Sequence, residues 1–291
     1  MLSGFTFNRI VIIQSLESFE TETGKILSEF ILGEQEIAAI NLPVEVISCG
    51  YAAEFLRIVQ KLTSEAASGS IPLLHVECHG DPIQGLEFEN GSMLSWEDVS
   101  GALLALNIAS GFNLLSVFSA CFGAHFLGQM GAITAAPCWC MVAPTKTVDP
   151  GEVLAGFRAF YTALFRVRDI GNAVNAIGRS RLSRGRWLSE FAEVWFQTVV
   201  TGYVKDHCNK LAALKRARKI YRQLKGNGQY ESIGAILRLL RKRNRQSLVQ
   251  EYFNVYFVTN QIPENITRFE NARQRVKAEL SKLRSTGQYI I

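Results

Sequence analysis

The first half of the chain alternates short apolar runs with longer segments whose apolar residues recur at helical spacing. The short runs are rich in β-branched residues and predict buried strands at Arg9–Gln14, Val44–Ser48, Ile71–Glu77, Asn113–Ser119 and Trp139–Ala143. The segments between them, at residues 20–39 and Ala52–Ala67, predict helices with one apolar face. Alternation of strands and helices predicts an α/β fold with a mostly parallel sheet flanked by helices.

Local signals refine this pattern. Leu86–Glu89 followed by Asn90-Gly91 predicts a small hairpin. Ser95 begins a sequence, Ser-Trp-Glu-Asp, that is typical of a capped helix start. From Asp149 onward the pattern is helical, except that Tyr252–Thr259 predicts one further strand.

Charge divides the chain into two regions. Residues 1–178 carry 8 Lys and Arg against 18 Asp and Glu, a net charge of −10. Residues 179–291 carry 23 Lys and Arg against 8 Asp and Glu, a net charge of +15. We therefore expect an acidic α/β domain over residues 1–178 and a basic, mainly helical extension over residues 179–291. Such halves can also attract each other, so the basic charge does not by itself require an outside partner.

Composition excludes several classes of protein. A chain of 291 residues that is 48% hydrophobic and 20% charged can bury a core, which argues against disorder. No apolar run reaches the roughly 18 to 20 residues of a membrane-spanning helix, and the N-terminus lacks the basic start of a secretory signal. Six cysteines in a chain of this length do not indicate a disulfide framework. These features predict a cytoplasmic protein without an integral membrane segment.

Two predicted strand ends carry residues suited to nucleophilic chemistry. The first strand runs into His79 and Gly80, and the second, about forty residues later, runs into Cys121. Ligands of open α/β sheets bind outside the carboxyl ends of the strands, where these side chains can meet. His79 would act as the general base and Cys121 as the thiolate nucleophile. The N–H groups of Gly80 and Cys121 would stabilise the developing oxyanion.

Neighbouring residues offer alternatives with ordinary structural explanations. A cysteine at a strand end is usually a small buried hydrophobe, and a single histidine is usually hydrogen-bonded in a core. His75 fits a buried, hydrogen-bonded histidine or a supporting group on the same strand face as His79. Cys78 is expected on the opposite face as a structural thiol, and His125 is a rival base one helical turn after Cys121. Cys138 and Cys140 are too close in sequence for the usual zinc spacing, so we expect no metal.

The stretch from Ile71 to Gly123 resembles the caspase-like clan of cysteine peptidases, and its bacterial CHAT branch in particular. The family pattern is an apolar strand ending in His-Gly, a hairpin, an acidic helix start, and an apolar strand ending in Ser-Ala-Cys-x-Gly. The corresponding segments here are LLHVECHG, GLEFENGSMLSWEDV and LLSVFSACFG. The similarity extends over roughly residues 8–178 and includes the opening strand. It implies a caspase-like sheet, a catalytic dyad of His79 and Cys121, and no cofactor. A cysteine at position 78 departs from the small or polar residue that would be unsurprising there.

The resemblance also places Asp149 near the pocket for the residue before the cleaved bond. An acid there would pair with an arginine or lysine of the substrate. Asp149 also precedes Pro150, a pairing that is typical of a helix N-cap. Both interpretations stay open at this point.

The resemblance implies limited proteolysis of a protein substrate. Bacterial relatives act in antiviral defence or programmed cell death, and a gasdermin-like pore former is the kind of partner that they activate. The chain lacks the glycine-rich phosphate loops, the HExxH metal motif and the GxSxG serine elbow. Two other functions remain: a non-catalytic scaffold with the same fold, and a nucleic-acid-binding regulator that uses the basic helices. The same helices, at Leu211–Leu224 and Ile233–Leu248, also suit the docking of a regulator.

Overall fold

The computed structural model describes residues 4–129, 131, 134–179 and 186–291. The chain forms two compact units. The sheet unit consists of Gly4–Met130 and Ala136–Ala192, and the helical unit is formed mainly by Glu193–Ile291. Each unit has a core of its own and is described separately.

The sheet unit is built on six strands in the order β2-β1-β3-β7-β8-β9. The bounds are β1 (Arg9–Gln14), β2 (Val44–Ser48), β3 (Pro72–Glu77), β7 (Leu115–Phe118), β8 (Cys140–Pro144) and β9 (Trp187–Phe191). The first five strands in this order are parallel, and β9 pairs antiparallel with β8. A second, small antiparallel sheet follows β3 and contains β4 (His79–Asp81), β5 (Gly85–Glu87) and β6 (Met93–Leu94). The predicted hairpin is therefore confirmed as β5 and β6, and the predicted mostly parallel sheet is confirmed as well.

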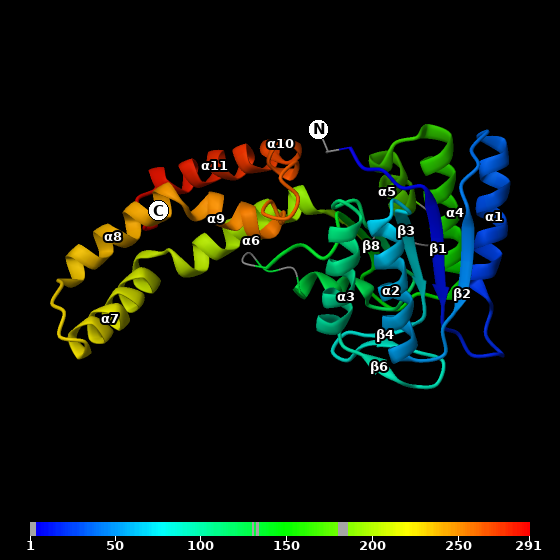
Figure 1. Cartoon of the computed structure of the whole chain (residues 1–291), viewed down its shortest axis with the longest axis horizontal. Coiled ribbons are helices and arrows are strands. Elements are labelled where there is room, and N and C mark those ends of the chain that lie inside the picture. The colour runs from blue at the N-terminus through cyan, green and yellow to red at the C-terminus, as the bar shows by residue number, and fades with distance from the viewer. Residues whose placement is uncertain (1–3, 130, 132–133, 180–185) are drawn as a thin grey trace. The chain divides into compact units, whose positions relative to one another are not determined.

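Helices cover both faces of the large sheet (Figure 1). One layer contains α1 (Thr23–Ile37), α4 (Pro150–Val167) and α5 (Ile170–Arg179), and the other contains α2 (Ala52–Ala67) and α3 (Trp96–Ala109). A short 3₁₀-helix, η1 (Gly123–Gln129), follows β7. Ser95 caps α3 by accepting a hydrogen bond from the N–H of Asp98, as the sequence predicts.

Coverage on both faces explains why the central strands read as continuous apolar runs rather than as alternating ones. Every residue of β3, β7 and β8 is buried. Large rings complete this core: Phe118 packs against Phe126 and Trp96 at the α3 side, and Phe157 packs against His75 at the α4 side. Apolar burial of this extent is the main force that holds the unit together.

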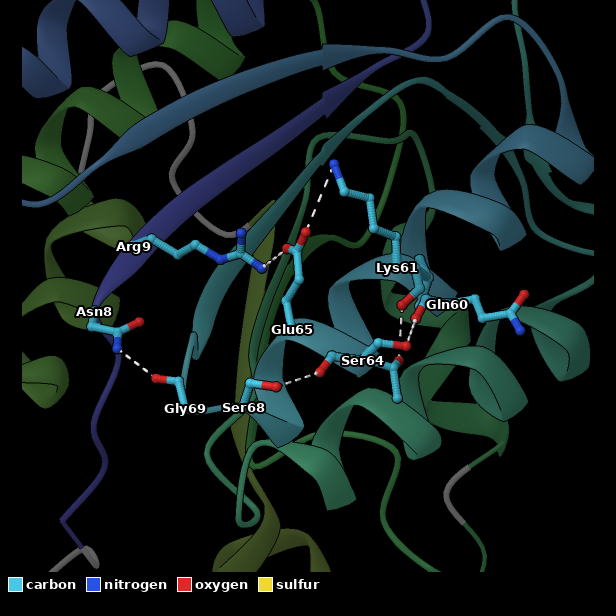
Figure 2. A network of polar contacts seen from close by, with 10 residues as sticks. Asn8, Arg9, Gln60, Lys61, Ser64, Glu65, Ser68 and Gly69 are labelled. Carbon is cyan, nitrogen blue, oxygen red and sulfur yellow. Dashed lines mark hydrogen bonds and ion pairs between the residues drawn. The ribbon is translucent and has the colours of Figure 1, made fainter.

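Polar contacts fasten the amino end of the sheet to the end of α2 (Figure 2). Arg9 at the start of β1 forms an ion pair with Glu65 of α2 at 2.6 Å, and Lys61 lies 3.7 Å from the same carboxylate. Next to them, the side-chain amide of Asn8 donates to the carbonyl oxygen of Gly69 at 2.7 Å. This network lies at the opposite end of the strands from their carboxyl edge, which leaves that edge open for a site.

The helical unit contains α6 (Ala192–His207), α7 (Lys210–Gly226), α8 (Ile233–Gln246), α9 (Leu248–Tyr256), α10 (Asn265–Arg268) and α11 (Glu270–Ser285). Aromatic rings form its core, where Phe196 of α6 packs against Phe253, Tyr256 and Phe257. Helices α7 and α8 are basic, and they meet at a turn in which Gly228 has a φ of +70°. Within the described part of the chain, no helix combines the length and apolar character needed to cross a membrane.

Two sequence predictions for the C-terminal region are wrong. Residues 252–259 form the end of α9 and a turn rather than a strand, because the aromatic side chains that suggested a strand lie on the packed face of a helix. Trp187–Phe191, in a stretch predicted to be helical, forms β9 through pairing with β8. The large sheet therefore extends beyond the predicted domain end at residue 178, and the division between the two units falls at Ala192 and Glu193.

We expect the stability of the sheet unit to fall as pH rises through the titration of Glu190 on β9. Burial raises the pKa of this carboxyl from 4.5 to about 7. The folded state therefore binds the proton more tightly than the unfolded state, so this contribution is fully present below pH 4.5 and is lost by about pH 7. Glu190→Gln should remove this part of the pH dependence and raise the free energy of unfolding at pH 8 by roughly 1–2 kcal/mol, because solvent screens part of the effect at a half-buried carboxyl. Chemical denaturation at pH 5 and pH 8 measures the difference; equal gains at both pH values would contradict it.

Candidate active site

The candidate site lies at the carboxyl edge of the large sheet, where the strand order reverses. The chain runs from β1 outward to β2 in one direction and from β3 through β7 to β8 in the other. Connections leave β1 and β3 toward opposite faces at such a point, and the crevice between them is where open α/β sheets bind ligands. Segments that follow β1, β3, β7 and β8 enclose a cavity here of about 120 Å³.

Both members of the predicted dyad line this cavity. Its walls are formed by Leu16, Glu20, Thr21, Thr23, Glu77, Cys78, His79, Ser119, Cys121, Val148, Pro150 and Val153. Strands β3 and β7 are direct neighbours with Val76 opposite Phe118, so the chain segments that carry His79 and Cys121 leave the sheet side by side. The N–H of Ser119 donates to the carbonyl oxygen of Val76 at 2.8 Å, which extends this pairing beyond the strand.

His79 is oriented by a carboxylate from another strand end. Its Nε2 lies 3.0 and 3.1 Å from the two carboxylate oxygens of Glu20, in the turn that follows β1. The N–H of Glu17 donates to Glu20 Oε2 at 2.7 Å and so fixes the carboxylate. The His79 side chain is 45% exposed, so it is accessible from solvent.

Cys121 lies in a tight turn between β7 and η1. The turn requires a left-handed backbone at Phe122, which has a φ of +60°. The N–H of Phe122 donates to the carbonyl oxygen of Lys146 at 3.3 Å, and the Sγ of Cys121 lies 3.8 Å from the carbonyl oxygen of Val148. Cys121 is partly exposed, whereas the five other cysteines are buried. The turn thus presents this thiol at the cavity wall.

Gly80 permits the close approach of the two segments. A Cβ atom added at this position would lie 2.2 Å from the carbonyl oxygen of Cys121, far inside van der Waals contact. The requirement for glycine is therefore one of space between the strand that carries His79 and the turn that carries Cys121.

A buried polar network lies beneath the cavity. His75 is fully buried, with Nδ1 3.0 Å from the hydroxyl of Tyr161 and Nε2 3.1 Å from the hydroxyl of Ser119. Glu77 is also buried, and its Oε2 accepts a hydrogen bond from the hydroxyl of Thr23 at 2.6 Å. Burial, together with the charge of Glu77, raises the pKa of Tyr161 well above its usual range. His75 is thus a buried, hydrogen-bonded histidine, as one of the two interpretations expected.

Two neighbouring residues differ in their suitability for catalysis. Cys78 was expected on the opposite face, but it lines the same cavity because the chain leaves the large sheet after Glu77 and enters β4. Burial and the nearby Glu77 carboxylate raise the pKa of the Cys78 thiol well above its usual range, which makes it a poor nucleophile. The ring of His125 packs edge-on against Phe122, and His125 does not line the cavity.

Asp149 forms a helix cap. Its side chain accepts a hydrogen bond from the N–H of Glu152 at 2.9 Å, and the Glu152 carboxylate accepts from the N–H of Asp149 at 3.3 Å. This reciprocal pair is a capping box at the start of α4, with Pro150 in the first helical position. Asp149 also borders an open recess beside Phe122, but it is not among the residues of the cavity that contains His79 and Cys121.

We expect Asp149→Ala to lower the free energy of unfolding by about 1 kcal/mol, because the first turn of α4 loses its cap. The cleavage that the resemblance to cysteine peptidases implies should keep its preference among residues, because Asp149 lies outside the cavity. Paired melting and peptide-cleavage measurements test both statements. A selective loss of cleavage after arginine or lysine would instead assign Asp149 to substrate recognition.

Cys138 and Cys140 are buried in the core next to and within β8. Burial raises the pKa of Cys138 to about 12, which disfavours the thiolate form that binds metals. In the part of the chain that the structure describes, no three His, Cys, Asp or Glu side chains are arranged to hold a metal ion.

Glu20 and Glu77 are the site residues that the sequence did not indicate. Glu20 belongs to an acid-rich stretch, Glu17–Glu22, that follows the first strand and resembles an ordinary solvent-exposed loop. The position of Glu20 after the end of a strand could have suggested a site residue. It lies beside His79, however, only because β1 is the neighbour of β3 in the sheet. Glu77, two residues before His79, looked like part of a strand with no separate purpose.

Fold and site together define an α/β protein with a cysteine and a histidine at the carboxyl edge of a mostly parallel sheet. No family model matches the chain, and no curated protein matches its sequence.

Proposed function

We propose that the protein is a cysteine endopeptidase that uses His79 and Cys121 as its catalytic dyad. One observation carries this proposal: the two side chains come from neighbouring strand ends and line a single cavity at the edge where such sheets bind ligands. The orientation of His79 by Glu20 adds the third group that usually holds a catalytic base in place.

The geometry suits acyl transfer through a thioester. Nε2 of His79 faces Glu20, which leaves Nδ1 to accept the proton of the Cys121 thiol. The thiolate attacks the carbonyl carbon of the scissile peptide bond, and the N–H groups of Gly80 and Cys121 stabilise the oxyanion. The His79 imidazolium then protonates the leaving amine, and the C–N bond breaks to give an acyl-enzyme. A water molecule, deprotonated by His79, hydrolyses the thioester and restores the thiol.

The resemblance to the caspase-like clan supports the same reaction. The mostly parallel sheet flanked by helices agrees with the fold that the resemblance implies, although such sheets occur in proteins of many functions. By resemblance to the bacterial CHAT branch, the substrate is a protein cut at a limited number of sites in the cytoplasm, for example a gasdermin-like pore former in antiviral defence.

Labelling by peptidyl probes with a thiol-reactive group tests the proposal. The probe should form one adduct, which peptide mapping by mass spectrometry should locate at Cys121, and a peptide library should yield defined cleavage products. A protein that is folded but neither labels at Cys121 nor cleaves any peptide would be a non-catalytic scaffold. Adducts at Cys78 with cleavage retained after Cys121→Ala would assign the nucleophile elsewhere.

The charge of the helical unit favours a second candidate, binding to nucleic acid. Helices α7 and α8 carry exposed basic residues at Lys210, Lys215, Arg218, Lys219, Arg222, Lys225, Arg238, Arg241, Lys242, Arg243 and Arg245. The same surface would also suit an acidic protein regulator. Binding to a nucleic acid through these side chains should weaken steeply as salt increases, and salt-independent binding would exclude it.

A further inference from the structure

We propose that a groove between α7 and α8 binds an acidic amphipathic helix of another protein. The groove belongs wholly to the helical unit, so this inference does not depend on the proposed peptidase function. Helices α7 and α8 lie side by side and form a hairpin (Figure 1). The groove has a volume of about 450 Å³, and its apolar walls are formed by Ile220, Leu224, Ile236, Leu239 and Leu240.

Apolar surface stays open to water in this groove. Leu239 is 61% exposed, although it lies next to other apolar side chains. Ile220, Leu224 and Leu240 are partly exposed as well. Ile236 is buried and closes the groove toward the contact between the two helices. Neighbouring apolar side chains that remain exposed in this way are typical of a surface that a partner covers.

The groove has the length of several helical turns. On α8, the lining residues Ile236, Leu240 and Arg243 follow one another at helical spacing, and the lining continues to Ser247. At 1.5 Å per residue this stretch is about 16 Å long. Ile220 also lines two adjoining recesses, so the hollow surface continues along the hairpin. A partner helix that lies along the groove would place about one apolar residue per turn in it.

The charge around the groove favours an acidic partner. Helix α7 carries seven lysines and arginines and α8 carries five, and neither helix contains an aspartate or glutamate. Lys242 lines the groove itself, and Arg216 and Arg222 line the recesses that adjoin it. Among the described residues of the lining, Glu231 is the one acid, and it lies in the turn before α8. A helix with an apolar stripe between acidic side chains therefore complements both the walls and the rim.

The form of the surface favours a protein helix over a nucleic acid or a membrane. A nucleic acid would use the basic side chains, but bases stack on aromatic rings, whereas the apolar walls of this groove are aliphatic. A lipid surface takes up the apolar face of a helix that lies flat on it, whereas here the apolar side chains of two helices enclose a hollow. A ridge of leucines on a partner helix fills such a hollow.

Binding of a synthetic peptide to the full chain tests the proposal. The probe is a fluorescein-labelled helical peptide with leucine at positions i, i+3, i+4 and i+7 and with glutamate and alanine elsewhere. We expect saturable binding, measured by fluorescence anisotropy. A peptide of the same composition with its leucines spread around the helix should bind at least about tenfold more weakly, and so should a peptide with lysine in place of glutamate. Absence of binding by the probe, or equal binding of the probe and either control peptide, would overturn the proposal.

Matched substitutions then locate the bound peptide. Leu239→Asp places a carboxylate in the groove and should weaken binding of the probe by at least about tenfold. Leu211→Asp makes the same change at a leucine of α7 that is 63% exposed and does not line the groove, so the affinity should stay within about threefold. Equal losses in the two variants would overturn the assignment to the groove.

A milder variant and two other ligands complete the test. If Leu239→Asp does not fold by circular dichroism, Leu239→Ala should still weaken binding of the probe several-fold, and an unchanged affinity would overturn the proposal. A uridine-rich RNA and phosphatidylserine vesicles should bind more weakly than the probe at the same salt concentration. Tighter binding of either one, with equal losses in Leu239→Asp and Leu211→Asp, would assign the surface to that ligand and overturn the proposal.

Discussion

Cys121→Ala is expected to lower peptide cleavage by about 10⁴-fold or more, and to abolish labelling by thiol-reactive probes. The reason is that, in the proposed mechanism, the thiolate forms the covalent intermediate, and no other group at this position can replace it. The free energy of unfolding should change by less than about 1 kcal/mol, because Cys121 is partly exposed and the contact of its sulfur with the carbonyl oxygen of Val148 is weak. Single-turnover cleavage and chemical denaturation of the same preparation measure both effects.

Cys49→Ala is the matched control for this experiment. Cys49 follows β2, is buried, and lies outside the cavity. Burial raises the pKa of this thiol to about 11, so little thiolate is present at neutral pH. The control should retain cleavage, even where the smaller side chain costs some stability. Full cleavage by folded Cys121→Ala would remove Cys121 from the reaction.

Gly80→Ala is expected to reduce cleavage by about 100-fold or more while the overall fold persists. The new methyl group would lie 2.2 Å from the carbonyl oxygen of Cys121, so the strand with His79 and the turn with Cys121 must move apart. A displacement of about 1 Å between reacting groups is enough for a rate loss of this size. Overpacking should also lower the free energy of unfolding by roughly 1–3 kcal/mol.

Gly101→Ala provides the control for adding a methyl group. Gly101 lies within α3, and a Cβ at this position meets no atom within 4 Å. Alanine favours a helix over glycine by roughly 0.5–1 kcal/mol, so this variant should be more stable and equally active. A Gly80→Ala protein with wild-type kinetics would show that the two segments can separate without cost, which would contradict the role given to this contact.

Much of the sheet unit was predictable from local sequence. Strands β1 and β2 and helix α2 have the predicted bounds, because each has a pattern of apolar residues that burial imposes on one kind of element. The aromatic-rich segment at residues 252–259 was not predictable in this way, because a short apolar run suits a buried strand and a buried helix equally. Strand β9 was missed because its conformation depends on pairing with β8, far away in the sequence.

Part of the candidate site was also predictable from local sequence, whereas the other part depends on the tertiary structure. His79 and Cys121 were identifiable because each lies two residues after a predicted strand and close to a glycine that is typical of a turn. Glu20 and Glu77 became site residues only through the order of strands, which brings the turn after β1 beside the end of β3. The sequence left two interpretations of Asp149 open, a substrate-pocket residue or a helix cap. Its hydrogen bonds with Glu152 show that it caps helix α4.

The sequence by itself determined the α/β class, the strand ends that carry His79 and Cys121, and the contrast in charge between the two regions. These features depend on residues close together in the chain, through periodicity, turn chemistry and composition. Only the tertiary structure decided which strand ends are neighbours, that Gly80 must lack a side chain, and that Glu77 is buried beside His75. Those properties depend on distances between segments that burial of the apolar strands brings together, and no local pattern encodes such distances.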